Sequence, residues 1–174
     1  MTDPNTGANV DVDREAVDVE ADDVGRLADG VQVRLCEPTL LHALRLRVLR
    51  PGQPPSSVDH EHDYWPDTFH VGAFSPDGVA VACATFYPEP SPDGRNGWRL
   101  RAMATAPEVR GMGYGGRVLR FGIDEVKARG GDRIWCNARS PAVWFYERLS
   151  FRSVSDEFEI APIGPHYVME LELG

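Results

Sequence analysis

The sequence lacks the features of a membrane or secreted protein. No run of about 18 apolar residues occurs, so no segment is long enough to cross a bilayer as a helix. The first residues, MTDPNTGANVDVD, are polar and acidic, without the basic start and apolar stretch of a secretory signal. We therefore expect a cytoplasmic protein that makes no contact with membranes.

Cysteine is also scarce. Cys36, Cys83 and Cys136 are odd in number and widely spaced, and none belongs to a CxxC pair. Each occurs in an apolar, strand-like stretch. This pattern favours buried free thiols over a disulfide framework or a zinc site.

Positive charge is outnumbered, with 18 Lys and Arg against 27 Asp and Glu, but the imbalance is local. Residues 1–23 hold eight acids and only Arg14, so they account for −7 of the net charge of −9 and leave −2 for the remainder. Such a tail has few large apolar residues to offset its ordering entropy. We expect a disordered acidic tail over 1–23 and one folded domain over 24–174. No basic stripe indicates nucleic-acid binding.

The spacing of apolar residues predicts an α+β fold. Three consecutive strands form an antiparallel meander, and a later helix makes a crossover between two strands. Residues 51–67 are expected to be a loop. The expected strands are 31–36, 68–74, 79–87, 98–105, 132–138, 151–160 and 166–173, and the expected helices are 39–50, 114–129 and 141–149.

A glycine-rich loop separates the strand 98–105 from the helix 114–129. Residues 110–116 are Arg-Gly-Met-Gly-Tyr-Gly-Gly. Glycines let the backbone approach a ligand closely, and the unpaired amides and dipole of a helix N-terminus favour an anion. A diphosphate group suits this place.

Several ligands could use such a loop. The loop is not a Walker A motif for nucleoside triphosphates, because that motif requires Lys after its last glycine and Arg117 follows Gly116 here. Gly111, Gly113 and Gly116 satisfy the GxGxxG pattern of dinucleotide-binding proteins. However, this loop follows a meander late in the chain, and Arg139 stands where that fold has an acid. Coenzyme A and a turn without any ligand remain as alternatives.

At this loop the sequence resembles the GNAT superfamily of N-acetyltransferases. The family's phosphate-loop motif is Arg/Gln-x-x-Gly-x-Gly/Ala, which Arg110, Gly113 and Gly115 match. Residues 142–151 resemble the family's N-x-x-A-x-x-x-Y-x-x-x-G-F helix, with Tyr146 as the tyrosine. The stretches 46–63 and 163–171 also resemble one branch of small members, so the likeness covers roughly residues 31–173.

The resemblance implies a mixed, mostly antiparallel central sheet with one splayed strand pair, flanked by helices. It implies an N-acetyltransferase that uses acetyl-CoA as co-substrate, without a metal. The acceptor would be an amine of a small molecule or a peptide, which attacks directly in a ternary complex, and the protein would be a monomer or homodimer. The implied coenzyme A-binding residues are Met103, Ala104, Thr105, Arg110, Gly111, Met112, Gly113, Tyr114, Gly115, Gly116, Asn137, Ala142 and Phe145.

The resemblance also suggests catalytic roles. Tyr146 is expected to be the general acid, since a phenol with a pKa of about 10 can protonate a thiolate of similar basicity. The strand 98–105 carries no carboxylate to act as a base. His166 and His70 are candidate bases and a water chain is an equal alternative; we group His166 with Tyr146 as the catalytic pair. The sequence departs from the family at Arg139, where Asn or Gln is usual, and at Ser150, where Gly is usual.

Charged residues elsewhere allow further expectations. Residues 59–63, Asp-His-Glu-His-Asp, resemble a metal cluster, but adjacent loop residues rarely all reach one ion. We expect a solvated loop near the acceptor entrance, whose acids would attract a cationic amine. Arg99, Arg101, Arg117 and Arg120 are expected to be surface charges, although Arg117 and Arg110, which flank the glycines, could instead contact phosphates.

Two other functions stay open. The first is a non-catalytic module that binds coenzyme A without turnover. The second is a partner-binding protein that acts through the acidic tail. The sequence does not choose the acceptor.

Overall fold

The computed structural model describes residues 29–174, so the expected acidic tail over 1–23 lies outside the described residues. The strands are β1 Gln32–Cys36, β2 Phe69–Phe74, β3 Ala80–Pro88, β4 Trp98–Thr105, β5 Arg133–Arg139, β6 Arg152–Ser153, β7 Phe158–Ile160 and β8 Gly164–Glu172. The helices are α1 His42–Leu49, α2 Tyr114–Ala128 and α3 Val143–Glu147. Short 3-10 turns occur at η1 Pro38–Leu41, η2 Pro55–Val58, η3 Glu61–Tyr64, η4 Pro107–Val109 and η5 Ser140–Ala142.

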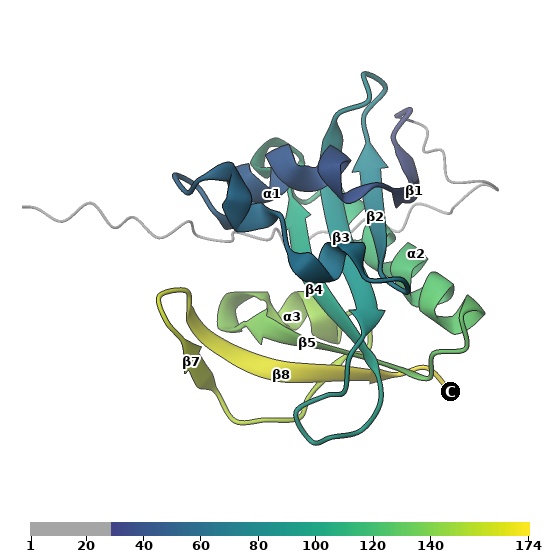
Figure 1. Ribbon diagram of the computed structural model, residues 1–174, viewed down its shortest axis with the longest axis vertical. Coiled ribbons are helices and arrows are strands. Elements are labelled where there is room, and N and C mark those ends of the chain that lie inside the picture. The colour runs from purple at the N-terminus through teal and green to yellow at the C-terminus, as the bar shows by residue number, and fades with distance from the viewer. Residues whose placement is uncertain (1–28) are drawn as a thin grey trace, which may run out of the picture.

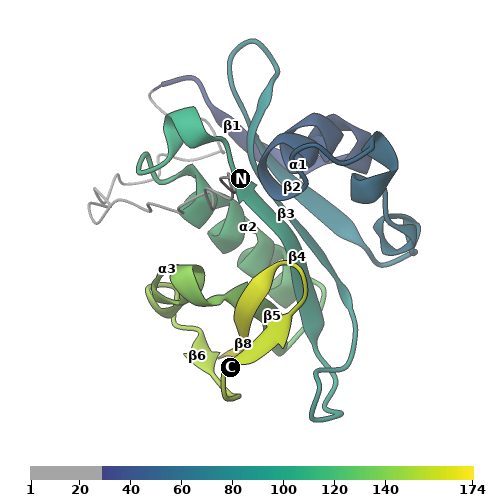
Figure 2. The ribbon, with the colours of Figure 1, turned by 90° about the vertical axis from the view of Figure 1, so that its left-hand side faces the viewer.

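The described strands form one sheet in the order β1-β2-β3-β4-β5-β8-β6, and β7 also pairs with β8. The pair β4–β5 is parallel, and the other pairs are antiparallel. Helix α1 covers one face, whereas α2 and α3 cover the other (Figures 1 and 2). The expected α+β fold, with one crossover helix in the middle of the chain, is confirmed.

Two expected elements differ in detail. The strand expected over 151–160 is wrong, because the chain forms two short strands, β6 and β7, along β8. Between them the Ser155 hydroxyl, rather than a backbone carbonyl, accepts the hydrogen bond of the Val168 amide, which interrupts the ladder. The helix expected over 39–50 begins as the 3-10 turn η1, because Pro38 occupies its first turn.

Helix α2 packs closely on the sheet at a glycine. A Cβ atom built on Gly122 would lie only 2.1 Å from the Phe86 ring, so only glycine allows this approach. The helix is apolar on the face that meets the strands, with Val118, Leu119 and Val126 fully buried. This packing fixes the N-terminus of α2 beside the end of β4.

The sheet opens between β4 and β5. Only Trp98 and Arg99 of β4 pair with β5, opposite Ile134 and Trp135. Ala102 has a φ of +51°, and the β3–β4 register shifts beside it, which marks a bulge. The β5-facing edge of β4 therefore has no strand partner after Arg99 within the described chain.

Two further expectations can be compared with the structure. Cys83 and Cys136 are buried free thiols, as expected, and Cys36 is free but only partly buried. Between residues 29 and 174, no helix has both the length and the apolar character required to span a membrane.

Candidate functional site

A cavity of about 670 Å³ lies where β4 and β5 separate. The N-terminus of α2, the C-terminal end of α1 and helix α3 complete its walls. The thirteen residues that the resemblance implies for coenzyme A binding all line this cavity, as do Tyr146 and His166. The structure thus brings together two segments that lie about thirty residues apart in the chain, the glycine loop and α3.

The glycines of the loop have distinct physical roles. Gly111 and Gly113 have φ values of 80° and 84°, in the left-handed region that other residues rarely adopt. Gly115 is needed for close packing, because a Cβ atom there would lie 2.9 Å from Oγ1 of Thr105. The loop therefore turns sharply twice and then sets the first turn of α2 against β4.

The N-terminus of α2 carries an excess of positive charge. Gly113 is the N-cap residue, no side chain caps the helix, and its first turn contains no acid. Arg110, Arg117 and Arg120 also line the cavity at this end. Positive side chains are unfavourable beside the positive end of a helix dipole, so this arrangement favours a bound anion.

An unpartnered polar group near this end supports the same interpretation. Nη1 of Arg117 is buried and has no hydrogen-bond partner among the described residues. The Tyr114 hydroxyl donates a hydrogen bond to Asp29, and burial, followed by the Asp29 contact, raises the pKa of Tyr114 to about 12. The Tyr114 side chain is therefore anchored away from the loop, and only its main-chain amide is available to a ligand there.

The central part of the cavity offers main-chain and amide groups. Met103, Ala104 and Thr105 belong to the free edge of β4, where main-chain groups have no strand partner. Opposite them, Oδ1 of Asn137 in β5 is buried without a hydrogen-bond partner in the described chain. Buried polar groups are normally hydrogen-bonded. A ligand with amide groups would supply hydrogen-bond partners for both the β4 edge and Oδ1 of Asn137.

Tyr146 of α3 lines the cavity and is 7% exposed. Its ring packs edge-on against Phe145 and Phe151, with centroids 5.1 Å and 5.6 Å away. Burial raises the pKa of Tyr146 well above its ordinary value, so the phenol remains protonated at neutral pH. Phe145 and Ala142 line the cavity beside it.

His166 lies at the start of β8, also on the cavity wall, and is 4% exposed. Its Nδ1 is 2.7 Å from the carbonyl oxygen of Gly164. A carbonyl only accepts hydrogen bonds, so Nδ1 carries the proton and Nε2 is left as the acceptor of the ring. His166 therefore has the tautomer that a general base requires.

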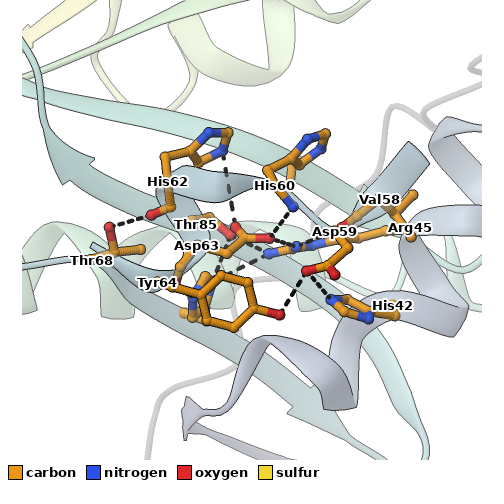
Figure 3. A network of polar contacts seen from close by, with 12 residues as sticks. His42, Arg45, Val58, Asp59, His60, His62, Asp63, Tyr64, Thr68 and Thr85 are labelled. Atoms are coloured by element: carbon orange, nitrogen blue, oxygen red, sulfur yellow. Dashed lines mark hydrogen bonds and ion pairs between the residues drawn. The ribbon is translucent and has the colours of Figure 1, made fainter. Parts of the chain in front are cut away.

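His70 has a different environment. It does not line the cavity, and both ring nitrogens are engaged in a buried network. Nε2 donates to the Asp63 carbonyl oxygen at 3.0 Å, so Nδ1 accepts from Arg45. Arg45 also donates to Oδ2 of Asp63 at 2.7 Å and to Oγ1 of Thr85 at 2.6 Å (Figure 3). This network joins α1, η3, β2 and β3, and His70 is part of it rather than of the cavity.

Only part of the acidic segment 59–63 is the solvated loop that the sequence suggests, since Asp59 and Glu61 are exposed but Asp63 is buried. Asp63 is 4% exposed and paired with Arg45, and Asp59 accepts a hydrogen bond from Tyr64 at 2.6 Å. Neither carboxylate lines the cavity. The expectation that these acids attract a cationic amine is therefore wrong for Asp63, because the Arg45 charge neutralises it.

One group of side chains in this region has metal-ligand character. Potential ligand atoms of His42, Asp59 and Asp63 lie within 4.8 Å of one another. However, the Arg45 guanidinium already occupies the Asp63 carboxylate and would repel a cation. The cluster is therefore explained by the buried ion pair and the surface hydrogen bonds around it.

Sequence reasoning missed the arginines on the α1 side of the cavity. Arg50, Arg101 and Arg139 all line it, although Arg101 was expected on the surface. Arg99 and Arg120, which were also expected to be surface charges, line the cavity as well. The signal was present in the Trp-Arg-Leu-Arg run at 98–101, whose alternation places both arginines on one face of β4. What the sequence could not show is that this face forms the cavity wall.

Comparison with known proteins identifies relatives for most of the chain. The model of the "Acetyltransferase (GNAT) family" matches residues 39–151. The uncharacterized N-acetyltransferase YitI of Bacillus subtilis is 31% identical over 130 residues, which cover 74% of this chain and 87% of YitI.

Solved structures share the fold. Escherichia coli ElaA superposes with a TM-score of 0.68 at 18% identity, over 82% of this chain and 99% of ElaA. An aminoglycoside 6'-N-acetyltransferase complexed with coenzyme A superposes with a TM-score of 0.64 at 17% identity, over 81% of this chain and 96% of that enzyme. At these identities the likeness concerns the arrangement of strands and helices alone.

Proposed function

Because the chain belongs to the GNAT acetyltransferase family, we propose that it transfers the acetyl group of acetyl-CoA to a primary amine by direct attack in a ternary complex. The observation that carries this proposal is the junction of an uncapped, arginine-flanked helix N-terminus with the open edge of β4 in one cavity. The helix N-terminus suits a diphosphate, and the open strand edge suits an arm that contains amide groups.

The chain's own groups fit coenzyme A along the length of the cavity. Main-chain amides of residues 111–116 would bind the diphosphate, with Arg110 and Arg117 beside them. The free edge of β4, around Met103 and Thr105, would pair with the amides of the pantetheine arm in the manner of an added strand. Oδ1 of Asn137 would accept one further N–H, which satisfies an atom that otherwise has no partner among the described residues.

The transfer itself requires one bond to form and one to break. Bound acetyl-CoA supplies an activated acyl group as a thioester. The neutral amine nitrogen of the acceptor attacks the carbonyl carbon, the C–N bond forms, the C–S bond breaks, and the electron pair leaves with sulfur. The amine loses one proton to a base, and the departing thiolate gains one from an acid.

Tyr146 is proposed as the acid. Its raised pKa keeps the phenol protonated until a strong base forms beside it, and a departing thiolate is such a base. The packing of its ring between Phe145 and Phe151 would hold the hydroxyl in a fixed position. A preset donor loses little entropy during the reaction.

His166 is proposed as the base, directly or through one water molecule. Its Nε2 is the acceptor nitrogen, since the Gly164 carbonyl holds the proton on Nδ1. The bulge at Ala102 would add an electrostatic contribution. The β3–β4 register shifts there, and a main-chain amide released from the ladder by this shift would donate to the carbonyl oxygen as negative charge develops on it.

Two measurements test this proposal. Calorimetric titration with coenzyme A and acetyl-CoA should give heat and raise the melting temperature, and the absence of both would overturn it. Incubation with acetyl-CoA and a panel of amines should release free thiol. Binding without thiol release from any amine would indicate a module that binds coenzyme A without turnover.

A further inference from the structure

The cavity is strongly basic, although the whole chain has a net charge of −9. Nine arginines line it, and no Asp or Glu between residues 29 and 174 does so. Arg110, Arg117 and Arg120 surround the N-terminus of α2, where a diphosphate would account for their charge. Three others, Arg50, Arg101 and Arg139, lie toward α1, and we refer to them as the arginine cluster.

The strand register explains why the arginine cluster faces α1. Arg99 of β4 pairs with Trp135 of β5, so these two side chains point to the same face. Alternation then places Arg101 and Arg139 on that face as well, and it is the face that α1 covers (Figure 2). Arg50 is the C-cap residue of α1, so it reaches the cavity from the helix that covers this face.

The members of the arginine cluster lie near one another. The pKa of Arg139 is lowered, first by burial and next by the positive charge of Arg50. Burial likewise lowers the pKa of His60, which also lines the cavity, and the charges of Arg101 and Arg50 act in the same direction. Like charges held together in a half-buried site repel one another, and an anion relieves that repulsion.

Neighbouring arginines are neutralised, but the arginine cluster is not. Arg45 pairs with Asp63 at 2.7 Å, and Arg99 pairs with Glu89 at 2.5 Å. Among residues 29–174, no carboxylate lies within ion-pairing distance of Arg50, Arg101 or Arg139. Partly buried cations without a partner are rare unless they bind a ligand.

The arginine cluster lies in a cavity rather than on a flat surface. Val58 of η2 and Ile163, in the turn between β7 and β8, also line this cavity. Figure 1 shows the β7–β8 turn projecting beside β5 and below the α1–η2 region. A concave site that combines apolar lining residues with a few convergent polar groups favours a small molecule over a protein surface as the occupant.

We propose that the acceptor is a small amine that also carries a carboxylate or phosphate group, which Arg50, Arg101 and Arg139 bind. This inference rests on the proposed acetyl transfer and names the acceptor class for it. Arginine suits the task, because its planar guanidinium makes two parallel hydrogen bonds to the oxygens of either anion. Binding of the anion would orient the amine toward the thioester.

Matched pairs of acceptors test the charge requirement. Glycine and glycinamide, and phosphoethanolamine and ethanolamine, differ only in the anionic group near the amine. In both pairs the anionic group raises the pKa of the amine, so a smaller fraction of the amine is uncharged and nucleophilic at neutral pH. Without a binding preference, the member that lacks the anion would therefore react faster. We expect the anionic member to have at least tenfold higher kcat/KM, and equal values or a preference for the neutral member would overturn the inference.

Variants locate the effect. Replacing Arg139 or Arg101 with Gln should lower kcat/KM for the anionic acceptor by roughly 10- to 100-fold, which corresponds to a charge-assisted hydrogen bond. The loss for the neutral acceptor should be much smaller, so the ratio of the two kcat/KM values should fall, and Arg139→Lys should recover part of that ratio. Arg47→Gln is the matched control, because Arg47 lies on α1, is half-exposed and does not line the cavity.

A binding measurement separates this inference from the proposed reaction. The protein saturated with coenzyme A is titrated with each acceptor, so no turnover can occur. The anionic member should bind at least tenfold more tightly than its neutral partner, and the Arg139→Gln change should remove the difference. If no amine releases thiol but this preference holds, the reaction is wrong and the acceptor class stands. If no anionic amine binds, or if the rate of thiol release is the same for charged and neutral acceptors, the proposed acceptor class is wrong.

Discussion

Arg45 of α1 and Asp63 of η3 form an ion pair 2.7 Å long in which each side chain is only 1% exposed. The pair attaches the 51–67 segment to the helix that borders the cavity. Three other buried groups share the Arg45 guanidinium, since His70, Thr85 and the Val58 carbonyl oxygen also accept hydrogen bonds from it. The pair therefore acts as a structural connection between the sheet and the α1 side of the cavity.

Removing one partner of this pair should be strongly destabilising. Asp63→Asn would leave the Arg45 charge buried without its counterion, and we expect a loss of about 3 to 5 kcal/mol in the free energy of unfolding. Urea denaturation measures it. Asp59→Asn is the control, because Asp59 is half-exposed and contacts only surface groups. A loss below about 1 kcal/mol for Asp63→Asn would show that the network adapts to the missing charge.

The segment next to this pair should make stability depend on pH. Burial lowers the pKa of His62 to about 4, so it is neutral in the native state, whereas an unfolded histidine titrates near 6.5. The unfolded chain therefore binds more protons between these values, and stability should fall as pH decreases from about 6.5 to 4.

The His62→Gln variant isolates this effect. It should lose part of the pH dependence, measured as the slope of the unfolding free energy against pH. Burial also lowers the pKa values of His60 and His70, so some slope remains in the variant. Identical slopes for both proteins would contradict a neutral native His62.

The glycine at the N-cap of α2 should matter for ligand binding beyond its effect on stability. Gly113 and Gly94 have φ values of 84° and 81°, and a Cβ atom on either would meet nothing within 4 Å. Changing either to Ala should therefore cost a similar amount, about 1 to 2 kcal/mol, by thermal unfolding. Only Gly113→Ala should weaken coenzyme A binding, by about tenfold, because it displaces the amides of the loop. Equal Kd values for both variants would argue against a diphosphate at this place.

Removal of the Tyr146 hydroxyl should affect turnover alone. Tyr146→Phe keeps the buried ring and its packing, so stability and the Kd of coenzyme A should change little. The rate of thiol release at saturating substrate should fall by about 100-fold or more if the phenol donates the proton. Tyr64→Phe is a control hydroxyl deletion outside the cavity. An unchanged rate for Tyr146→Phe would mean that the tyrosine only packs.

The sequence predicted most of the architecture because the spacing of apolar residues is regular in the strands and in α2. It also predicted the glycine loop, since a loop that enters a helix from a strand leaves a recognisable run of glycines. The split between β6 and β7 was not predictable, because it depends on the Ser155 side chain replacing one backbone hydrogen bond. Such a substitution leaves no mark on the apolar pattern.

The charges were harder to place than the apolar residues. The sequence predicts surface positions for Asp63 and Arg101, because nothing in a single sequence shows which distant side chain a charge will meet. Asp63 is instead buried against Arg45, eighteen positions earlier, and Arg101 faces the cavity. Strand register places Arg99, Arg101 and Arg139 on one face of the sheet, and the apolar pattern of the sequence does not show this register.

The separation of β4 and β5 after two residue pairs has a consequence for the mechanics of the molecule. Strands β1–β4 and β5–β8 are two half-sheets with little main-chain bonding between them, so amides along the open edge of β4 should exchange with deuterium far faster than those of β3. A ligand that bridges the gap would act as a removable ninth strand. Slowed exchange on both sides of the gap would then report its arrival, even in a variant that performs no chemistry.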